Sequence, residues 1–350
     1  MLHSIWQAGK ILWTLHSGSD SPSVTRKEML LVLEHTLIEV DHYEPESSYR
    51  GTLVLVHGMS PKGKDDPRML ALCSALSQVG FRVLAPEIAS IKALKIEAAQ
   101  IKELAEIFLS IAEDRALTPT GKLGVLAPSF SGALSLAAAS RPEVSDKIEA
   151  ICAIGAFTQV DTVMSYLLQA QDADPYGRFI ALKKIIPLVY PEDTLIQGAL
   201  DAAIDDNINA RTVDDLNNAL NTYLQNIPQQ DRQDILRLFQ DAQYRESLFS
   251  RSKGIMSEEL AAIDVMQNIA GLKARVFLLH GRDDNVIPCE QSERLYQQLK
   301  HLQKHVKLVV TPFIDHGDTA FHLRQVRDLA RIIQGFSNYF RDLSRVSVLH

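Results

Sequence analysis

The stretch that most constrains the fold of this 350-residue chain is residues 122–139, KLGVLAPSFSGALSLAAA. Between Lys122 and Ala127 apolar side chains fall on both faces, which is typical of a central strand in a parallel sheet. From Phe130 onward, small and apolar residues recur at helical spacing without a charge. The stretch therefore predicts a buried strand, a sharp turn at Ser129 and a helix.

The residues around Ser129 suit a strained turn with a serine at its corner. Such a corner brings the backbone two residues before and after the serine close to neighbouring elements, and the small residues Ala127 and Ser131 meet that need. The segment APSFSG resembles the nucleophile elbow of the α/β-hydrolase superfamily, which usually reads G-x-S-x-G-G. Two glycines of that pattern are replaced here, while Gly132 is kept.

Two other interpretations of this junction stay open. In the first, Ser129 only caps the helix at a strand-to-helix junction, as a serine does in many α/β proteins. In the second, Ser131 is the nucleophile, flanked by Ser129 and Ala133. The second is weaker, because Ser129 follows the strand at the expected distance and leaves Gly132 where helix and sheet pack closely.

Composition limits the classes of protein to consider. With 46% hydrophobic and 23% charged residues, the chain can bury a large core. A net charge of −7 argues against nucleic acid as a partner. The cysteines, Cys73, Cys152 and Cys289, are far apart and indicate neither a disulfide framework nor a metal site. Without a long apolar run or a secretory leader, we expect a cytoplasmic protein.

The order of the expected elements indicates an α/β fold with a mostly parallel central sheet flanked by helices. A short helix is expected before Thr36. Strands are expected at 36–43, 52–58, 81–88, 122–127, 147–157, 274–281 and 306–312, with helices between most of them. From Gln159 to about Ser252 only helical segments are evident, which predicts a helical cap inserted between two strands of one sheet.

The N-terminus forms a separate amphipathic segment. Its apolar residues share one face of a helix spanning residues 2–16: Leu2, Ile5, Trp6, Gly9, Leu12 and Trp13. We expect this helix to dock on its own chain, on a second subunit or on a membrane surface. Because Lys10 is its only charged side chain, the helix would gain little from anionic lipid, and we favour protein as the surface on which it docks. The expected divisions are 1–23 (helix and linker), 24–157 (core), 158–268 (cap) and 269–350 (core).

Two loops complete the resemblance to the superfamily. The segment HGRDDNVIP follows a strand and resembles the loop of the triad acid, which the pattern places at Asp284, with Asp283 as the rival. The segment PFIDHGD follows the last strand and resembles the loop of the triad base, which places it at His316. The order Ser129, Asp284, His316 is that of the superfamily.

The resemblance also implies an oxyanion hole and a reaction. Its two backbone N–H groups would belong to Phe130 and to Met59, and His57 would be structural. The implied activity is hydrolysis of a small or acyl-chain carboxylic ester or thioester through an acyl-enzyme, without cofactor or metal. Alternatives on this fold are an acyltransferase, a peptidase or a non-catalytic ligand-binding homologue.

A competing motif suggests nucleotide hydrolysis. GMSPKGKD, from Gly58 to Asp65, fits the phosphate-binding pattern G-x-x-x-x-G-K. The next position should be Ser or Thr for Mg²⁺, whereas Asp65 brings a negative charge, and Pro61 lacks an N–H donor. We therefore rank nucleotide hydrolysis well below the hydrolase interpretation.

Overall fold

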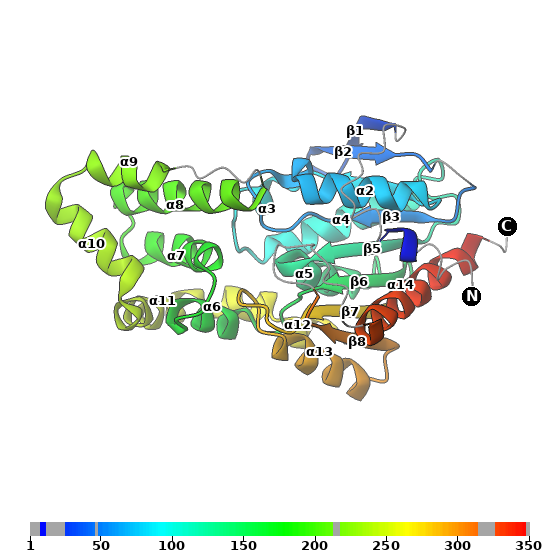
Figure 1. Ribbon diagram of the computed structural model, residues 1–350. Helices are drawn as coiled ribbons and strands as arrows, with labels where there is room; N and C mark the ends of the chain where they lie inside the picture. The colour runs from blue at the N-terminus through cyan, green and yellow to red at the C-terminus, as the bar shows by residue number, and fades with distance from the viewer. Residues whose placement is uncertain (1–7, 12–24, 46–47, 213–217, 314–325, 348–350) are drawn as a thin grey trace.

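A computed structural model describes residues 8–11, 25–45, 48–212, 218–313 and 326–347. Its centre is an eight-stranded sheet in the order β1-β2-β4-β3-β5-β6-β7-β8 (Figure 1). The six strands from β4 to β8 in this order are parallel to one another. Strand β2 pairs antiparallel with β4, and β1 pairs antiparallel with β2. The strands are β1 (Arg26–Val32), β2 (Leu37–Tyr43), β3 (Thr52–Leu55), β4 (Arg82–Pro86), β5 (Leu123–Pro128), β6 (Ile148–Ile154), β7 (Arg275–Gly281) and β8 (Val306–Thr311). The expected mostly parallel sheet is confirmed.

The expected short helix before Thr36 is wrong, because this segment is strand β1. Within it, Leu31 is buried, while its neighbours Leu30 and Val32 are exposed, which is the alternation of a strand with one buried face. Val32 stands opposite Leu37 in the antiparallel ladder with β2. Pairing with a neighbouring strand thus decides the structure of a segment whose local pattern is ambiguous.

Helices cover both faces of the sheet. On one face, α4 (Ala99–Glu113), α5 (Ser129–Ala139) and α13 (Glu290–His301) contribute to the larger apolar cluster. On the other, α2 (Pro67–Gln78) and α14 (Val326–Ser347) build a second cluster with the strands. A single turn, α3 (Ala89–Lys92), follows β4. No described helix is long and apolar enough to cross a membrane.

Part of the N-terminal segment packs on its own chain. Residues 8–11 are helical, and Ala8 and Ile11 are buried in the second apolar cluster, with α2 and α14. The two tryptophans of the expected apolar stripe lie outside the described residues. Self-association and membrane contact through this segment stay predictions.

A block of helices separates β6 from β7. Between Gly155 and Ala274, the described residues form helices and loops and contain no strand. The helices are α6 (Val160–Gln169), α7 (Pro175–Val189), α8 (Thr194–Thr212), α9 (Ala219–Gln225), α10 (Gln229–Gln240), α11 (Ala242–Ile263) and α12 (Val265–Asn268). Most of them extend away from the sheet on one side (Figure 1). The expected helical insertion is present, while its division from the core at 158 and 268 stays a prediction.

Candidate active site

Ser129 occupies a strained position where β5 meets α5. Its φ of +55° lies in the left-handed region, which a residue other than glycine rarely adopts. The N-cap of α5 is Pro128, and no side chain caps this helix. The interpretation of Ser129 as a simple helix cap is therefore wrong. The backbone instead has the sharp strand-to-helix turn that the sequence around Ser129 predicts.

The packing around the turn explains why its neighbours are small. A Cβ atom added to Gly132 would lie 2.9 Å from the carbonyl oxygen of Ala127 and 3.3 Å from the Cβ of Ala153. A larger residue would push α5 off the sheet.

Ser131 is completely buried, and its hydroxyl donates a hydrogen bond to the carbonyl oxygen of His57, 2.5 Å away. Ser131 is thus buried and engaged, which removes it as a candidate nucleophile.

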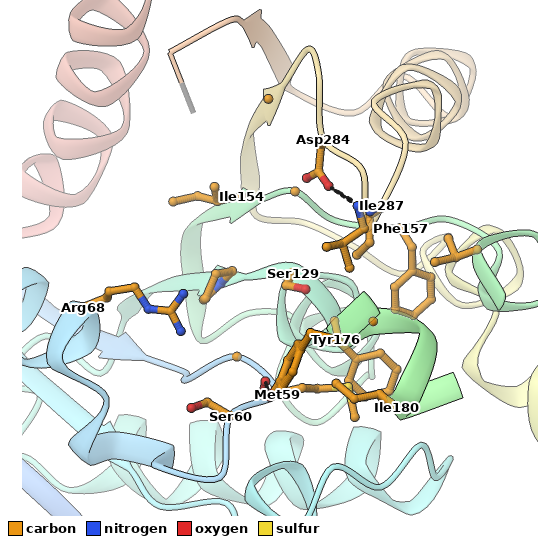
Figure 2. A pocket seen from close by; sticks show the side chains of 18 of the residues that line it. Met59, Ser60, Arg68, Ser129, Ile154, Phe157, Tyr176, Ile180, Asp284 and Ile287 are labelled. Carbon is orange, nitrogen blue, oxygen red and sulfur yellow. Dashed lines mark hydrogen bonds between the residues drawn. The ribbon is translucent and has the colours of Figure 1, made fainter. Parts of the chain in front are cut away.

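The two candidate triad acids differ in their surroundings. Asp283 is exposed to solvent, whereas the side chain of Asp284 is buried. Asp284 Oδ1 accepts hydrogen bonds from the N–H groups of Val286 and Ile287, each at 2.9 Å. Figure 2 shows Asp284 pointing toward Ile287. These two donors fix the orientation of the carboxyl group. The geometry favours Asp284 over Asp283.

A buried histidine supports the Asp284 loop. His280 Nε2 lies 2.7 Å from the carbonyl oxygen of Ile287 and 3.4 Å from Asp284 Oδ2, and its Nδ1 lies 2.6 Å from Ser292 Oγ. The ring therefore ties the end of β7 to α13 and to the loop between them. The sequence analysis missed this role, although His280 opens the HGRDD motif.

The candidate residues converge on one edge of the sheet. Parallel strands end at the same edge, so the carboxyl ends of β3, β5, β7 and β8 lie along one edge of the sheet. The loops after these strands begin near His57, Ser129, Gly281 and Thr311. His316 lies outside the described residues, and its role as the base stays a prediction.

A cavity of about 290 Å³ opens beside Ser129. Figure 2 shows Ser129 within it, with Asp284 on one side and Met59 and Tyr176 on another. Most of the lining is apolar and comes from both the helical insertion (Val160, Val163, Met164, Leu167 and Ile180) and the core (Ile11, Leu72, Ile154 and Phe336). The site can therefore surround an apolar group next to the serine.

One ion pair lies in the wall of this cavity. The guanidinium group of Arg68 binds both carboxylate oxygens of Asp66, with Nε 2.9 Å from Oδ1 and Nη2 2.7 Å from Oδ2. Burial alone would raise the pKa of Asp66, but the hydrogen bond and charge of Arg68 outweigh burial and lower it. The pair thus stays charged yet balanced, and Asp66 also accepts a hydrogen bond from Ser60 Oγ at 3.0 Å. No sequence motif pointed to this pair.

The geometry around the expected oxyanion hole is compatible with its two donors. Phe130 is the second residue of α5, where a backbone N–H has no acceptor within the helix. Met59 lines the same cavity, and its N–H makes no hydrogen bond to another described residue. Both amides therefore lie at the cavity without an internal partner in the described part of the chain.

His57 is held by backbone atoms on both sides of its ring. Nε2 accepts a hydrogen bond from the N–H of Ile88 at 3.0 Å, so the proton of the neutral ring is on Nδ1, which donates to the carbonyl oxygen of Gly58 at 2.9 Å. Burial lowers the pKa of His57 and keeps the ring neutral. These contacts agree with the expected structural role.

The competing phosphate-binding interpretation does not fit the structure. Lys64 is almost fully buried, and its Nζ donates to Asp41 Oδ1 at 3.0 Å and to Glu28 Oε1 at 3.1 Å. Burial would lower the pKa of Lys64, but these carboxylates outweigh burial and raise it. The lysine thus joins the loop to β1 and β2 and is absent from the cavity lining.

Solved structures show the same architecture. A Pyrococcus horikoshii acylaminoacyl peptidase is similar with a TM-score of 0.50 and 16% identity, over 91% of this chain and 41% of the peptidase. A Pyrococcus furiosus esterase is similar with a TM-score of 0.51 and 15% identity, over 92% of this chain and 95% of the esterase. The protein has the α/β-hydrolase fold.

A family match in sequence and a further solved structure bear on the type of enzyme that this α/β-hydrolase fold carries. The prolyl oligopeptidase family matches residues 221–342, a range that includes Asp284 and His316 but not Ser129. A Mycobacterium tuberculosis puromycin-hydrolyzing peptidase is similar in structure with a TM-score of 0.51 and 12% identity, over 91% of this chain and 39% of the peptidase. No curated protein matches in sequence. The chain spans only about two fifths of both peptidases. The family match and the fold together support a serine hydrolase.

Proposed function

We propose that the protein hydrolyses carboxylic esters or thioesters of apolar acids or alcohols through an acyl-enzyme. The observation that carries this proposal is the strained turn at Ser129, which opens into an apolar cavity that also contains Asp284. A serine hydroxyl is a poor nucleophile by itself, so a strained and accessible position has a use only when a base is near. We assign that base to His316.

In the proposed mechanism, the hydroxyl of Ser129 attacks the carbonyl carbon while His316 accepts its proton. Asp284 orients the imidazole and stabilises its charged form. The backbone N–H groups of Met59 and Phe130 stabilise the negative charge on the tetrahedral oxygen. The alcohol or thiol leaves with the proton from His316, and a water molecule deprotonated by His316 then releases the acid and restores Ser129.

The cavity supports the preference for apolar substrates. Its lining from the helical insertion consists of aliphatic, thioether and aromatic side chains, and its charged pair, Arg68 and Asp66, is internally balanced. A buried apolar chain gains about 0.8 kcal/mol for each methylene removed from water.

Because the thiols of Cys73, Cys152 and Cys289 are all free, we also propose a reducing, cytoplasmic compartment.

A peptidase is the second candidate, because the matching family is the prolyl oligopeptidase family. A peptidase needs donors and acceptors for the peptide backbone, whereas the described cavity offers mainly apolar surface. Matched acyl p-nitrophenyl esters and aminoacyl p-nitroanilides would separate the two candidates. We expect kcat/KM to rise with acyl chain length in the esters and to be low for the anilides.

Covalent labelling tests the proposal as a whole. A fluorophosphonate should add one adduct to the intact protein, which Ser129→Ala removes and Ser131→Ala retains. An adduct that persists in Ser129→Ala would move the nucleophile elsewhere. A complete absence of labelling and turnover in the native chain would instead indicate a ligand-binding homologue without catalysis.

A further inference from the structure

The loop from His57 to Ser60 has every carbonyl oxygen bound by a donor. This loop follows β3 and contains Met59, whose N–H is one of the two proposed oxyanion donors. The hydrogen bonds are Ser131 Oγ to the His57 carbonyl (2.5 Å), His57 Nδ1 to the Gly58 carbonyl (2.9 Å), Tyr176 Oη to the Met59 carbonyl (2.9 Å) and Gly63 N to the Ser60 carbonyl (2.9 Å). Four consecutive peptide planes are thereby fixed.

This arrangement decides which groups the loop can present to the cavity. A peptide plane can expose either its carbonyl or its N–H on one side, and a carbonyl turned toward a developing oxyanion would repel it. Because the carbonyl oxygens of residues 57–60 are held by donors of the protein, the loop cannot turn them into the cavity without breaking a hydrogen bond. The N–H of Met59, which makes no hydrogen bond to another described residue, remains for a ligand.

One of the four donors comes from the helical insertion. Tyr176 is the second residue of α7, follows Pro175 and is nearly fully buried. It lines the cavity beside Ser129, and its hydroxyl reaches a loop 117 residues earlier in the chain (Figure 2). The other three donors belong to the loop (His57), to the chain shortly after it (Gly63) and to α5 (Ser131). Tyr176 therefore links the insertion to the loop that carries Met59.

We propose that Tyr176 is a positioning residue: by holding the carbonyl of Met59 it fixes the peptide group that follows Met59, and so supports the adjoining Gly58–Met59 peptide group, whose N–H is the proposed oxyanion donor. The insertion would then support catalysis as well as shape the pocket. This inference rests on the proposed hydrolase function. Loss of one properly placed oxyanion donor costs roughly 10²–10³ in kcat, so loss of its support should cost less than that.

The test compares Tyr176→Phe with Tyr190→Phe. Both variants keep the aromatic ring, and both tyrosines lie on or next to α7, but the Tyr190 hydroxyl pairs with the Tyr244 hydroxyl at 3.0 Å, inside the insertion. Active sites are titrated with a fluorophosphonate, so that kcat refers to folded, competent molecules. We expect Tyr176→Phe to lower kcat about tenfold with KM within a factor of about two, and Tyr190→Phe to change neither.

A transition-state mimic gives the second readout. A trifluoromethyl ketone forms a hemiketal with the serine and places an oxyanion in the hole, so its inhibition constant should rise in Tyr176→Phe by about the factor lost in kcat. An unchanged kcat and inhibition constant in Tyr176→Phe, or equal losses in both variants, would overturn the role of Tyr176. If the native chain neither reacts with the fluorophosphonate nor turns over esters, the hydrolase function fails instead.

Discussion

The hydroxyl of Ser131 is bound to the carbonyl oxygen of His57, and this single hydrogen bond joins the helix of the nucleophile elbow to the loop of the proposed oxyanion hole. The two residues lie 74 positions apart in the chain. Most members of the superfamily pattern have glycine at the position of Ser131. The departure from the pattern therefore has a physical use, since glycine has no hydroxyl to hold this loop.

Replacing Ser131 by alanine should lower activity without removing the nucleophile. The variant keeps the small volume that the turn requires but leaves the buried His57 carbonyl without its donor, which costs about 1–3 kcal/mol. We expect a lower melting temperature and a severalfold lower kcat, with the fluorophosphonate adduct still on Ser129. Ser135→Ala is the control, because Ser135 is equally buried in α5 but its hydroxyl has no hydrogen-bond partner among the described residues. Equal kcat in Ser131→Ala and Ser135→Ala would contradict this prediction.

Replacing Asp284 by asparagine should abolish most turnover. The amide can still accept the hydrogen bonds from Val286 and Ile287, so the loop is expected to keep its conformation. A neutral amide cannot stabilise the charged imidazole, and kcat should fall by about 10⁴, as for other serine triads. Asp283→Asn changes an exposed neighbour in the same way and should leave kcat within a factor of about three. The reverse ranking of the two variants would move the acid to Asp283.

Much of the fold could be predicted because the relevant signals are local. A strand buried on both faces, such as residues 122–127, reads as a continuous apolar run, and helices between such strands impose a parallel sheet. The turn at Ser129 is also local, since its small neighbours are within a few residues. The loop with Asp284 follows its strand directly, so its position could be predicted in the same way.

The remaining features depend on contacts between distant segments. Strand β1 forms because β2 is available to pair with it, and its own residues, RKEMLLV, show no clear period. The bond from Tyr176 to Met59 connects an inserted helix to a core loop. No spacing in the sequence shows such a contact, because it depends on how α7 packs over the end of the sheet.

Stability should fall when the pH drops below about 6.5, in part because of His57. Burial lowers the pKa of His57 below its usual 6.5, so the unfolded chain binds the proton more readily than the folded protein. The stabilisation is complete above pH 6.5 and is lost as the pH falls, at up to about 1.4 kcal/mol per pH unit for one histidine. Urea unfolding at pH 7.5 and 5.5 measures this difference.

His57→Gln provides the comparison for the pH effect. The glutamine amide can both donate and accept a hydrogen bond but does not titrate, so the free energy of unfolding should depend less on pH in this range. The free energy of unfolding of His57→Gln should still depend on pH to some extent, because burial also lowers the pKa of His42. An identical pH dependence in His57→Gln and the native chain would show that the His57 pKa is the same in the folded and unfolded states.

Narrowing the cavity at Ile180 should change which acyl chains the protein accepts. Ile180 is nearly buried on α7, lines the cavity and lies close to Tyr176 in Figure 2. A tryptophan at this position would occupy space that a long acyl chain needs. Excluding two methylenes from the cavity costs about 1.6 kcal/mol, which corresponds to about a tenfold change in kcat/KM. We therefore expect Ile180→Trp to lower kcat/KM about tenfold for octanoyl esters while acetyl esters stay within a factor of about three.

Ile255→Trp makes the same substitution outside the cavity. Ile255 is on α11, is 66% exposed and does not line the cavity, so its replacement should leave the order of preference among acyl chains unchanged. The decisive quantity is the ratio of kcat/KM for octanoyl and acetyl esters, since this ratio cancels any general loss of folded protein. If Ile180→Trp lowers kcat/KM equally for both esters, Ile180 only maintains the packing of α7, and the acyl chain binds in the part of the cavity lined by the core, beside Leu72 and Phe336.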